Sequence, residues 1–560
     1  VLHVDHTAIK TLPDSIGLLC NLNELQLNFC PRLVALPSNI CKLRSLQTLF
    51  VTACSNLEQF PLELGNMECL RELHVGGTAI RHLPDSIGLL KNITVISGHG
   101  NCRSLATKSH FPSFQFLALP RSLNTTSFLP PSVSGLHSLS ELDLSYCSLS
   151  DGDIPDDLGG LSSLRVLDLR KNRFCLLPSS LGQLTSLKKL FLSRCWKLKS
   201  ILEFPPNLRR LIARDCRALE NIPDLSNMKF LKYLDLESCC KLTDLSCMWY
   251  ASSPLATSCA ALQIYRVLHA DHTAIKTLPD SIGLLCNLIE LHVSFCPRLV
   301  ALPSNICKLR SLQKLFVTAC SNLEQFPLEL GNMECLRDLH VGGTAIKNLP
   351  DSIGLLKNIT IISAHGNCRS LVTKSHFPSF QFLALPRSLN ATSFLPPSLS
   401  GLHSLSKLDL SYCSLSEWDI PDDLGGLSSL RVLDLRKNRF CLLPSSLGQL
   451  TSLEELFLSR CWKLKSILEF PPNLRHLIAR NCRALENIPD LSNMKFLNYL
   501  DLESCCKLVN ILGLENLNCV QEINMEGCHY LSTSFACSRR SLIHSTRHDI
   551  KGFMNNRSAI

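Results

Sequence analysis

Leucine and other aliphatic residues recur along almost the whole chain in units of roughly 21 to 25 residues. One unit carries Leu22, Leu25 and Leu27, and the next unit repeats that spacing from Leu46. In the first part of each unit, apolar and polar positions alternate, which predicts a short β-strand with one buried side. The second part contains a proline before further apolar residues, as at Pro84, which predicts a return segment that is not a strand.

The spacing L-x-x-L-x-L-x-x-N/C-x-L at this period is typical of leucine-rich repeats. It predicts an α/β solenoid, a horseshoe with a parallel β-sheet on the concave face and short helices, 3₁₀ turns and loops on the convex face. One unit cannot offset the entropy of ordering its own residues, so the units must stack. In the first half of the chain, strands are expected to begin near Leu22, Leu46, Leu70, Ile93, Leu139, Leu164, Leu187, Leu208 and Leu231.

The chain contains the same long sequence twice. Residues 1–242 and 267–508 align without gaps at an offset of 266, and 22 of the 242 aligned positions differ. We call these segments the first and second copy. Each array is interrupted by a segment that fits no single unit, at 102–128 and 368–394. A loop insertion and an irregular double-length repeat both fit these segments.

The duplication predicts four regions. A first repeat array is expected over 1–242, a junction without leucine periodicity over 243–264, and a second array with two additional repeats over 265–536. Residues 537–560 are polar and basic, which predicts a disordered tail. Since Val1 already lies within a repeat, we expect the chain to continue a longer polypeptide whose preceding segment covers the first unit.

Composition and motifs favour binding over catalysis. The net charge of +9 is a mild bias for 560 residues and does not predict nucleic-acid binding. The apolar runs are shorter than the ~20 residues of a membrane span. The chain has no nucleotide-binding P-loop, no H-E-x-x-H and no G-x-S-x-G motif, so neither enzymatic activity nor a cofactor is expected.

The nearest approach to a metal motif is His3-Val-Asp5-His6, repeated as His269-Ala-Asp-His272. Residues i and i+3 of a strand face opposite sides, so the two imidazoles should diverge. We therefore expect these histidines to be ordinary surface residues and expect no metal site.

Cysteines occupy a regular place in the repeat, three residues after the second strand leucine. Asn172 and Thr78 take the same place in sister repeats, which predicts an inward ladder of small groups that bond the backbone of the adjacent turn. A disulfide framework is the alternative, but free buried thiols fit the spacing better and suit a reducing compartment. The ladder cysteines of the first copy are Cys30, Cys54, Cys147, Cys195, Cys216 and Cys239.

The surface expected to bind a partner consists of the outward residues of the strands. Aromatic and arginine side chains there are favoured interface anchors, although Phe50 and Phe191 could equally pack against neighbouring strands. The candidates in the first copy are Gln26, Asn28, Phe50, Glu72, His74, Glu141, Asp143, Tyr146, Asp168, Arg170, Lys189, Phe191, Arg210 and Arg214. Those in the second copy are His292, Ser294, Lys314, Phe316, Asp338, Lys407, Tyr412, Arg436, Glu455, Phe457 and His476.

Eight of the 22 differences between the copies fall on such outward positions, and two of them reverse a charge. Changing this surface while keeping the core is how a recognition protein would alter its partner. The eight pairs are Gln26/His292, Asn28/Ser294, Thr48/Lys314, Glu72/Asp338, Glu141/Lys407, Lys189/Glu455, Arg210/His476 and Asp215/Asn481.

Several motifs resemble one protein family. They are Leu33-x-x-Leu36-Pro37-x-x-Ile40, the segment LDLSYCSLS over 142–150, and the segments over 203–216 and 513–517. Over nearly all of residues 1–536 the chain resembles the leucine-rich region of plant intracellular immune receptors, those with a TIR and a nucleotide-binding domain. This chain carries neither of those modules, so the resemblance implies no nucleotide chemistry here.

The resemblance implies a role in defence. Such a region would recognise pathogen effectors or host proteins that they modify, and would hold a nucleotide-binding switch inactive, in the cytoplasm or shared between cytoplasm and nucleus. The alternative is a general leucine-rich scaffold, such as a signalling adaptor or a ubiquitin-ligase substrate receptor. A cell-surface receptor would instead predict cysteine caps and a leader peptide, and neither is present in this sequence.

Overall fold

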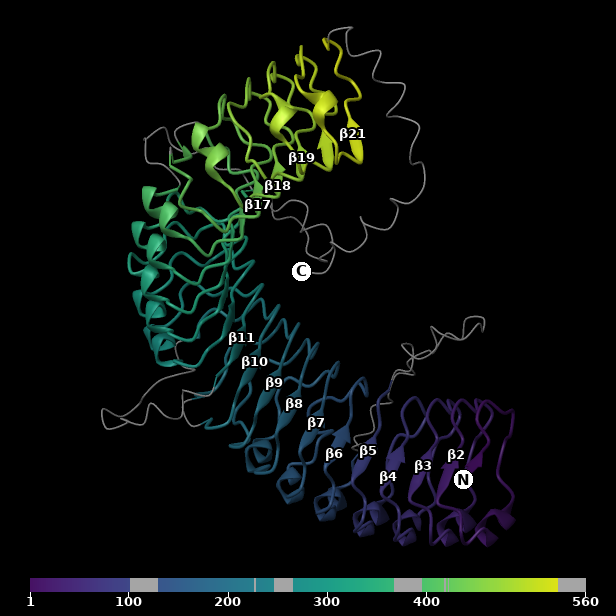
Figure 1. Cartoon of the computed structure of the whole chain (residues 1–560). Coiled ribbons are helices and arrows are strands. Elements are labelled where there is room, and N and C mark those ends of the chain that lie inside the picture. Colours follow the sequence, from purple (N-terminus) through teal and green to yellow (C-terminus); the bar gives the residue numbers. More distant parts are fainter. Residues whose placement is uncertain are drawn as a thin grey trace. The chain divides into compact units, whose positions relative to one another are not determined.

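The computed structural model describes residues 1–100, 129–225, 228–245, 265–366, 395–416, 419–421 and 423–531. Both interruptions of the repeat, most of the junction and the basic tail lie outside these ranges. The described residues form two compact units, which divide within the second copy (Figure 1). Unit 1 contains 1–337 and 344–346, and unit 2 contains 338–343 and the described residues from 347 onward.

All strands are two or three residues long, and they pair in parallel. Each strand of unit 1 pairs with the next along the chain, from β1 to β13, and the strands of unit 2 do the same from β14 to β21. In every pairing the middle leucine or isoleucine lies beside its counterpart, as Leu25 beside Leu49. The repeat spacing therefore fixes the register.

The strands of unit 1 are β1 (Leu2–His3), β2 (Glu24–Gln26), β3 (Thr48–Phe50), β4 (Glu72–His74), β5 (Val95–Ser97), β6 (Glu141–Asp143), β7 (Val166–Asp168), β8 (Lys189–Phe191), β9 (Arg210–Ile212), β10 (Tyr233–Asp235), β11 (Val267–His269), β12 (Glu290–His292) and β13 (Lys314–Phe316). Those of unit 2 are β14 (Asp338–His340), β15 (Ile361–Ser363), β16 (Lys407–Asp409), β17 (Val432–Asp434), β18 (Glu455–Phe457), β19 (His476–Ile478), β20 (Tyr499–Asp501) and β21 (Glu522–Asn524). Each strand expected from the sequence is present, and it begins two residues after the leucine or isoleucine from which it was predicted.

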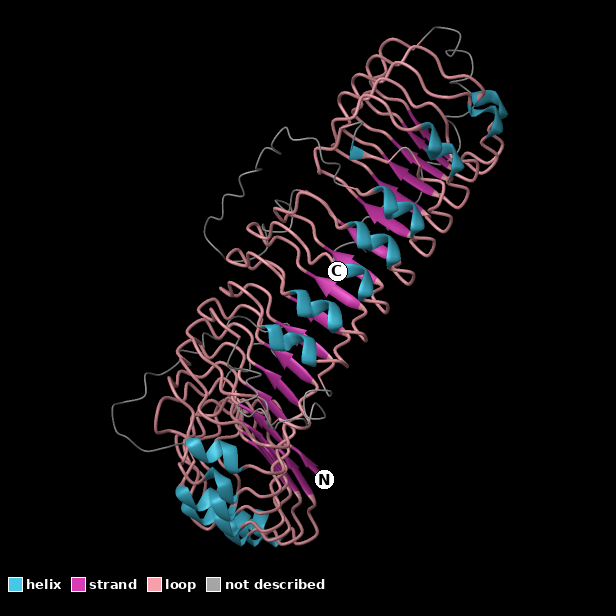
Figure 2. Ribbon diagram, turned by 90° about the vertical axis from the view of Figure 1, so that its left-hand side faces the viewer, coloured by secondary structure: helices cyan, strands magenta, loops and turns pink. Residues whose placement is uncertain are grey.

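Most return segments contain a 3₁₀ helix, those between β8 and β9 and between β18 and β19 consist of turns and loops, and none of the described residues is α-helical. Figure 2 shows these helices following a different side of the ribbon from the strands. Many begin after a proline, such as Pro37 with φ −67° and ψ 148°, because the ring fixes an extended residue just ahead of the turn. The helix then buries one aliphatic side chain, as Ile40 does.

The helices of unit 1 are η1 (Asp14–Leu18), η2 (Ser38–Lys42), η3 (Leu64–Asn66), η4 (Asp85–Leu89), η7 (Pro131–Gly135), η8 (Leu158–Gly160), η9 (Ser179–Gln183), η12 (Asp280–Leu284), η13 (Ser304–Lys308) and η14 (Leu330–Asn332). Those of unit 2 are η15 (Asp351–Leu355), η16 (Pro397–Gly401), η18 (Ser445–Gln449), η19 (Leu491–Asn493) and η20 (Leu514–Asn516). No helix of the described chain has the length and apolarity that crossing a bilayer requires.

The cysteine ladder forms as the sequence predicts. Each ladder thiol donates to a backbone carbonyl of the preceding repeat, as Cys54 does to Leu27 at 2.9 Å and Cys216 to Leu192 at 3.1 Å. The residue just before each ladder position has a positive φ, for example 62° at Ala53, which turns the next side chain inward. All cysteines in the described ranges are free thiols.

Thiol labelling tests the ladder within one peptide. Cys20 is exposed and Cys30 is buried, and both lie in the tryptic peptide 11–32. At pH 8 an alkylating reagent should modify Cys20 within minutes and Cys30 only after unfolding, because Cys30 is inaccessible. Burial raises the pKa of Cys54 to about 12, so this second ladder thiol should react equally slowly.

Tandem mass spectrometry of the labelled peptide locates the modification. Equal labelling of Cys20 and Cys30 in the native protein would contradict a buried ladder. A peptide mass that corresponds to a disulfide between Cys20 and Cys30 would favour the alternative of a disulfide framework.

Candidate recognition face

The residues that flank the buried middle residue of each strand form one surface, which we call the strand face. In β3, for example, Leu49 is buried while Thr48 and Phe50 are partly exposed. Most strands of both units show the same pattern, although the last residue of β7, β10, β15, β17 and β20 is also buried. The strand face thus consists of the two residues that flank the middle of each strand and the residues just after it. The surface results directly from the period-2 alternation of a strand.

In the first repeats the outward residues of the first copy contact one another. Gln26 donates to Glu24, and Phe50 stacks on His74 with ring centroids 4.4 Å apart. The His74 ring lies 3.4 Å from the Glu72 carboxylate. Phe50 therefore packs along the sheet, as the plainer interpretation of the sequence allowed, and still exposes part of its ring.

Further along the first copy, cations lie over aromatic rings. The Arg170 guanidinium lies 5.7 Å from the centre of Phe191 and binds Asp168, and this hydrogen bond raises the pKa of Arg170. Arg210 lies 4.4 Å from the centre of the Tyr233 ring. Glu141 and Lys189 are exposed, and Asp143 is partly exposed. Tyr146 packs against Lys171. Arg214 forms ion pairs with Asp235 and Glu237.

The second copy repeats the arrangement with altered charges. Phe316 stacks on His292 at 4.2 Å, Lys314 pairs with Glu290 at 3.1 Å, and Arg436 lies over Phe457 and binds Asp434. His476 lies 3.5 Å from Glu455, where the first copy has Arg210 beside Lys189. Lys407 is exposed, Tyr412 packs against Lys437, and Asp338 accepts a hydrogen bond from Thr360.

Three expected surface residues are largely structural. Asp168 and Ser294 are buried, with exposed fractions of 7% and 8%, so the expectation that they are available to a partner at the surface is wrong. Asp168 binds the backbone N–H of Arg170, and Ser294 accepts from the N–H of Thr318. Asn28 is partly exposed, but its side-chain oxygen likewise accepts a backbone N–H, that of Thr52.

A column of basic residues precedes the strands β7 to β10 and was not among the sequence candidates. Lys188, Arg209 and Lys232 each donate a backbone N–H to the preceding member at 2.8 to 2.9 Å, so the side chains lie next to one another. No carboxylate pairs with them among the described residues. We define the basic patch as Arg165, Lys188, Lys189, Arg209, Arg210 and Lys232.

A shallow hollow of about 270 Å³ lies within this patch. The exposed ring of Phe230 contributes an apolar wall. No acidic residue contributes to its lining, which is Arg165, Thr185, Ser186, Lys188, Asn207, Arg209 and Phe230.

The internal duplication contained the signal for this patch. Four cations of the first copy, Lys188, Lys189, Arg210 and Lys232, correspond to Glu454, Glu455, His476 and Asn498 in the second. Lys189 and Arg210 lie on outward strand positions, whereas Lys188 and Lys232 lie just before a strand. A comparison of the copies that is limited to strand positions therefore omits Lys188 and Lys232. The structure brings the four differences together.

Histidines gather on the strand face near the end of the junction. The ring of His269 lies against that of His292, with centroids 4.0 Å apart, and Asp271 lies beside them. Burial and the nearby His269 lower the pKa of His292. His272 stacks instead on Phe295 at 4.4 Å, so His269 and His272 diverge as expected.

Sequence comparisons agree with the repeat geometry. A leucine-rich repeat region model matches residues 206–342, and a single-repeat model matches 138–161, 163–184, 404–427 and 429–450. TMV resistance protein N of Nicotiana glutinosa is 37% identical over 234 residues, which cover 42% of this chain and 18% of that protein. Disease resistance-like protein DSC1 of Arabidopsis thaliana is 39% identical over 222 residues, covering 40% and 16%.

The chain thus spans less than a fifth of the length of these two relatives. Among solved structures, a leucine-rich repeat protein of Leptospira interrogans is similar, with a TM-score of 0.38 and 22% identity over 81% of this chain and 89% of that one. The repeat signature and the paired strands with 3₁₀ returns identify the chain as a leucine-rich repeat solenoid, and its repeats are similar in sequence to those of plant disease resistance proteins.

Proposed function

We propose that this chain is the protein-recognition region of a plant intracellular immune receptor, and that it binds pathogen effectors or their host targets through the strand face. In a longer receptor the same region would also contact a nucleotide-binding domain and restrain it. The chain acts by binding and needs neither a catalytic group nor a cofactor. Its place of action is the cytoplasm, alone or together with the nucleus.

One observation carries this proposal. The two copies keep the same buried leucines except Leu27, which is Val293 in the second copy, while seven of the eight differing pairs named above change the charge or hydrogen-bonding capacity of the side chain. A scaffold whose surface only keeps it in solution has no need to replace Lys188 and Lys189 together with Glu454 and Glu455. A recognition surface changes its partner in this way, because like charges repel the former partner.

The chemistry of the basic patch indicates the kind of partner segment that the first copy fits. Its cations lack carboxylate partners among the described residues, and Phe230 adds an exposed apolar ring. An acidic segment with at least one apolar side chain would complement both features. The second copy, with Glu454 and Glu455 in the corresponding place, should reject that segment.

The proposal is tested by binding to purified proteins. The chain is immobilised and exposed to a panel of purified secreted pathogen proteins and of the host proteins that they modify. We expect at least one micromolar or tighter binder whose affinity falls by about tenfold or more in Lys189→Glu/Arg210→Glu. The matched control is Lys42→Glu/Arg44→Glu, which changes the same charges at and just after the 3₁₀ helix η2.

Equal losses in the two double variants would show a non-specific charge effect and count against the strand face. A binder that ignores both variants would also contradict the proposal. A binder that depends on the strand face but belongs to a ubiquitin-ligase complex would favour the scaffold alternative.

A further inference from the structure

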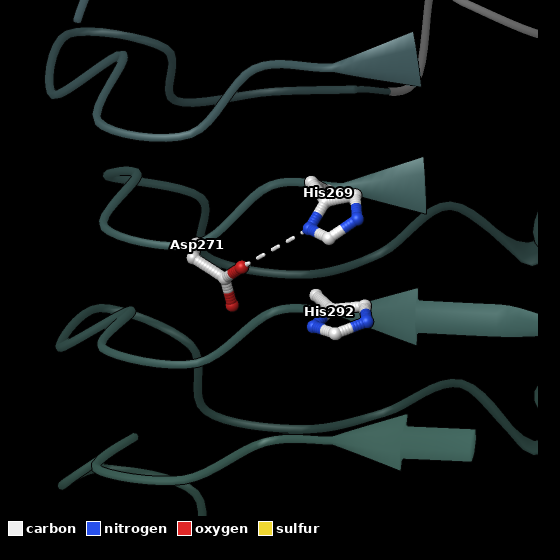
Figure 3. A group of neighbouring side chains, drawn as sticks. All are labelled: His269, Asp271 and His292. Atoms are coloured by element: carbon white, nitrogen blue, oxygen red, sulfur yellow. Dashed lines mark ion pairs between the residues drawn. The ribbon is translucent and has the colours of Figure 1, made fainter. Parts of the chain in front are cut away.

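Three potential metal ligands converge on the strand face of unit 1. His269 ends β11, Asp271 follows two residues later, and His292 ends the neighbouring strand β12. One ligand atom from each residue lies within 4.8 Å of the other two, and His269 Nδ1 lies 3.7 Å from Asp271 Oδ2. Figure 3 shows both imidazole rings with a nitrogen on the side of the Asp271 carboxylate.

The backbone places these side chains together. The pairing of β11 with β12 sets His269 directly beside His292, so their rings stack with an interplanar angle of 21°. Phe316 supports the other side of the His292 ring. Asp271 Oδ1 accepts the backbone N–H of Ser294 at 2.6 Å, which fixes the carboxylate and directs Oδ2 toward His269.

The second nitrogen of His292 has the surroundings of a ligand histidine. His292 Nε2 is buried and makes no hydrogen bond, and the carboxylate oxygen Glu290 Oε2 lies 3.6 Å from it. Ligand histidines usually direct their other N–H at a carboxylate, which fixes the tautomer and leaves the remaining nitrogen free for the metal. Glu290 can serve as that carboxylate.

We propose that His269, Asp271 and His292 bind a divalent transition-metal ion of the zinc class, with one coordination position left for water or for an atom of a bound partner. Two imidazoles and a carboxylate suit zinc, cobalt or nickel, whereas calcium and magnesium prefer oxygen ligands. Ligand atoms around tetrahedral zinc lie about 3.3 Å apart. The separations here therefore have to close by at most about 1.5 Å, which rotation of the two partly exposed imidazole rings toward the Asp271 carboxylate can supply.

The first copy provides an internal control. His3 and Asp5 occupy the corresponding positions, and Asp5 Oδ1 accepts the backbone N–H of Asn28 at 2.7 Å just as Asp271 does with Ser294. The third position is Gln26, whose amide oxygen lies 2.9 Å from His3 Nδ1. Because a carboxamide is a poor ligand for zinc-class ions, the first copy should not bind the ion.

Titration of the whole chain with Co²⁺ and Zn²⁺ tests the site. Calorimetry should show one tight site in the wild type, and the Co²⁺ spectrum should lack the intense thiolate charge-transfer band that cysteine ligands would produce. His292→Gln should weaken this binding by about 100-fold or more, because it removes one of three ligands. Glu290→Gln should weaken it by about tenfold, because it removes the orienting carboxylate.

Two matched variants complete the experiment. His272→Gln should leave binding unchanged, since His272 lies three residues from His269 but outside the group. Gln26→His should raise the stoichiometry from one ion to two, because it completes the same set with His3 and Asp5. Circular dichroism and thermal unfolding without metal confirm that each variant is folded.

The proposal is overturned if the folded His292→Gln variant binds as the wild type does, if a thiolate band accompanies the tight site, or if Gln26→His adds no second ion. Metal binding that survives loss of His292 would be assigned to cysteines elsewhere in the chain.

Discussion

The triple variant Lys188→Glu/Lys189→Glu/Arg210→His is expected to weaken binding of an acidic peptide to this chain by about 100-fold. A fluorescein-labelled peptide of glutamate residues around a single leucine serves as the probe, and fluorescence anisotropy measures its Kd. The variant reverses two charges and removes a third in the basic patch. Losing about 1 kcal/mol at each of the three sites gives about 3 kcal/mol, or roughly 100-fold.

The expected loss does not require unfolding. Lys189 and Arg210 are exposed, and Lys188 is partly exposed. The substituents are those that the second copy carries at the same places in the same fold, Glu454, Glu455 and His476. The melting temperature of the variant should therefore stay within a few degrees of the wild type, and wild-type binding should weaken steeply as salt is added.

The converse variant is the sharper control. Glu454→Lys/Glu455→Lys/His476→Arg/Asn498→Lys gives the second copy the charges of the basic patch, and should create a second peptide site of similar affinity. If the second copy gains no binding, the charges alone do not make the site. If the first copy keeps its binding after the triple substitution, the basic patch is not the peptide site.

Repeat spacing made most of the fold predictable. A strand leucine such as Leu49 is buried because alternate residues of a strand face the same side, and this needs only local sequence. The ladder was predictable for the same reason, since Cys54 and Asn172 hold one fixed place in the unit. Local spacing also located the nine strands from β2 to β10, because each begins at the same place in its repeat.

What local spacing missed depends on contacts between repeats. His269 and His292 are 23 residues apart, and they meet only because β11 and β12 pair with both strand ends in register. The spacing within one repeat pairs His269 with His272, but His272 stacks on Phe295 and lies apart from His269. The basic column was missed because Lys188 lies one residue outside the strand.

Burial of polar residues was equally hard to foresee. Asp168 occupies an outward strand position, yet it is buried because it binds Arg170 through both backbone and side chain. Alternation specifies the direction of a side chain, but not whether a longer neighbour covers it. Ser294 differs in that its short hydroxyl bonds the next turn, at Thr318.

The largest effect on stability is expected at Asn172, whose side chain joins two repeats. This residue is 1% exposed. Its oxygen accepts the backbone N–H of Leu149, and its amide donates to the carbonyls of Leu144 and Leu169, all at 2.9 Å. Substitution Asn172→Val keeps much of the volume but leaves the Leu149 N–H and the Leu144 carbonyl without partners, while the Leu169 carbonyl keeps only the weaker bond from the Cys195 thiol at 3.2 Å.

Each orphaned group costs about 1–3 kcal/mol, so with two of them Asn172→Val should lower the free energy of unfolding by about 2–6 kcal/mol. Denaturation with urea measures this loss, and hydrogen exchange at the Leu149 amide should accelerate in parallel. Asn438, which makes the same three bonds in unit 2, should give an equal loss when changed to valine. Cys216→Ala removes one weak thiol bond at the same ladder position and should cost only about 1 kcal/mol.

This comparison separates two explanations of the ladder. If the ladder residues only fill space, Asn172→Val should cost less than Cys216→Ala, because valine has a volume similar to that of asparagine whereas alanine is smaller than cysteine. If they act by satisfying the backbone at each turn, Asn172→Val must exceed Cys216→Ala by several kcal/mol. We expect the second result, because three satisfied backbone groups at one buried side chain outweigh the packing of a single thiol.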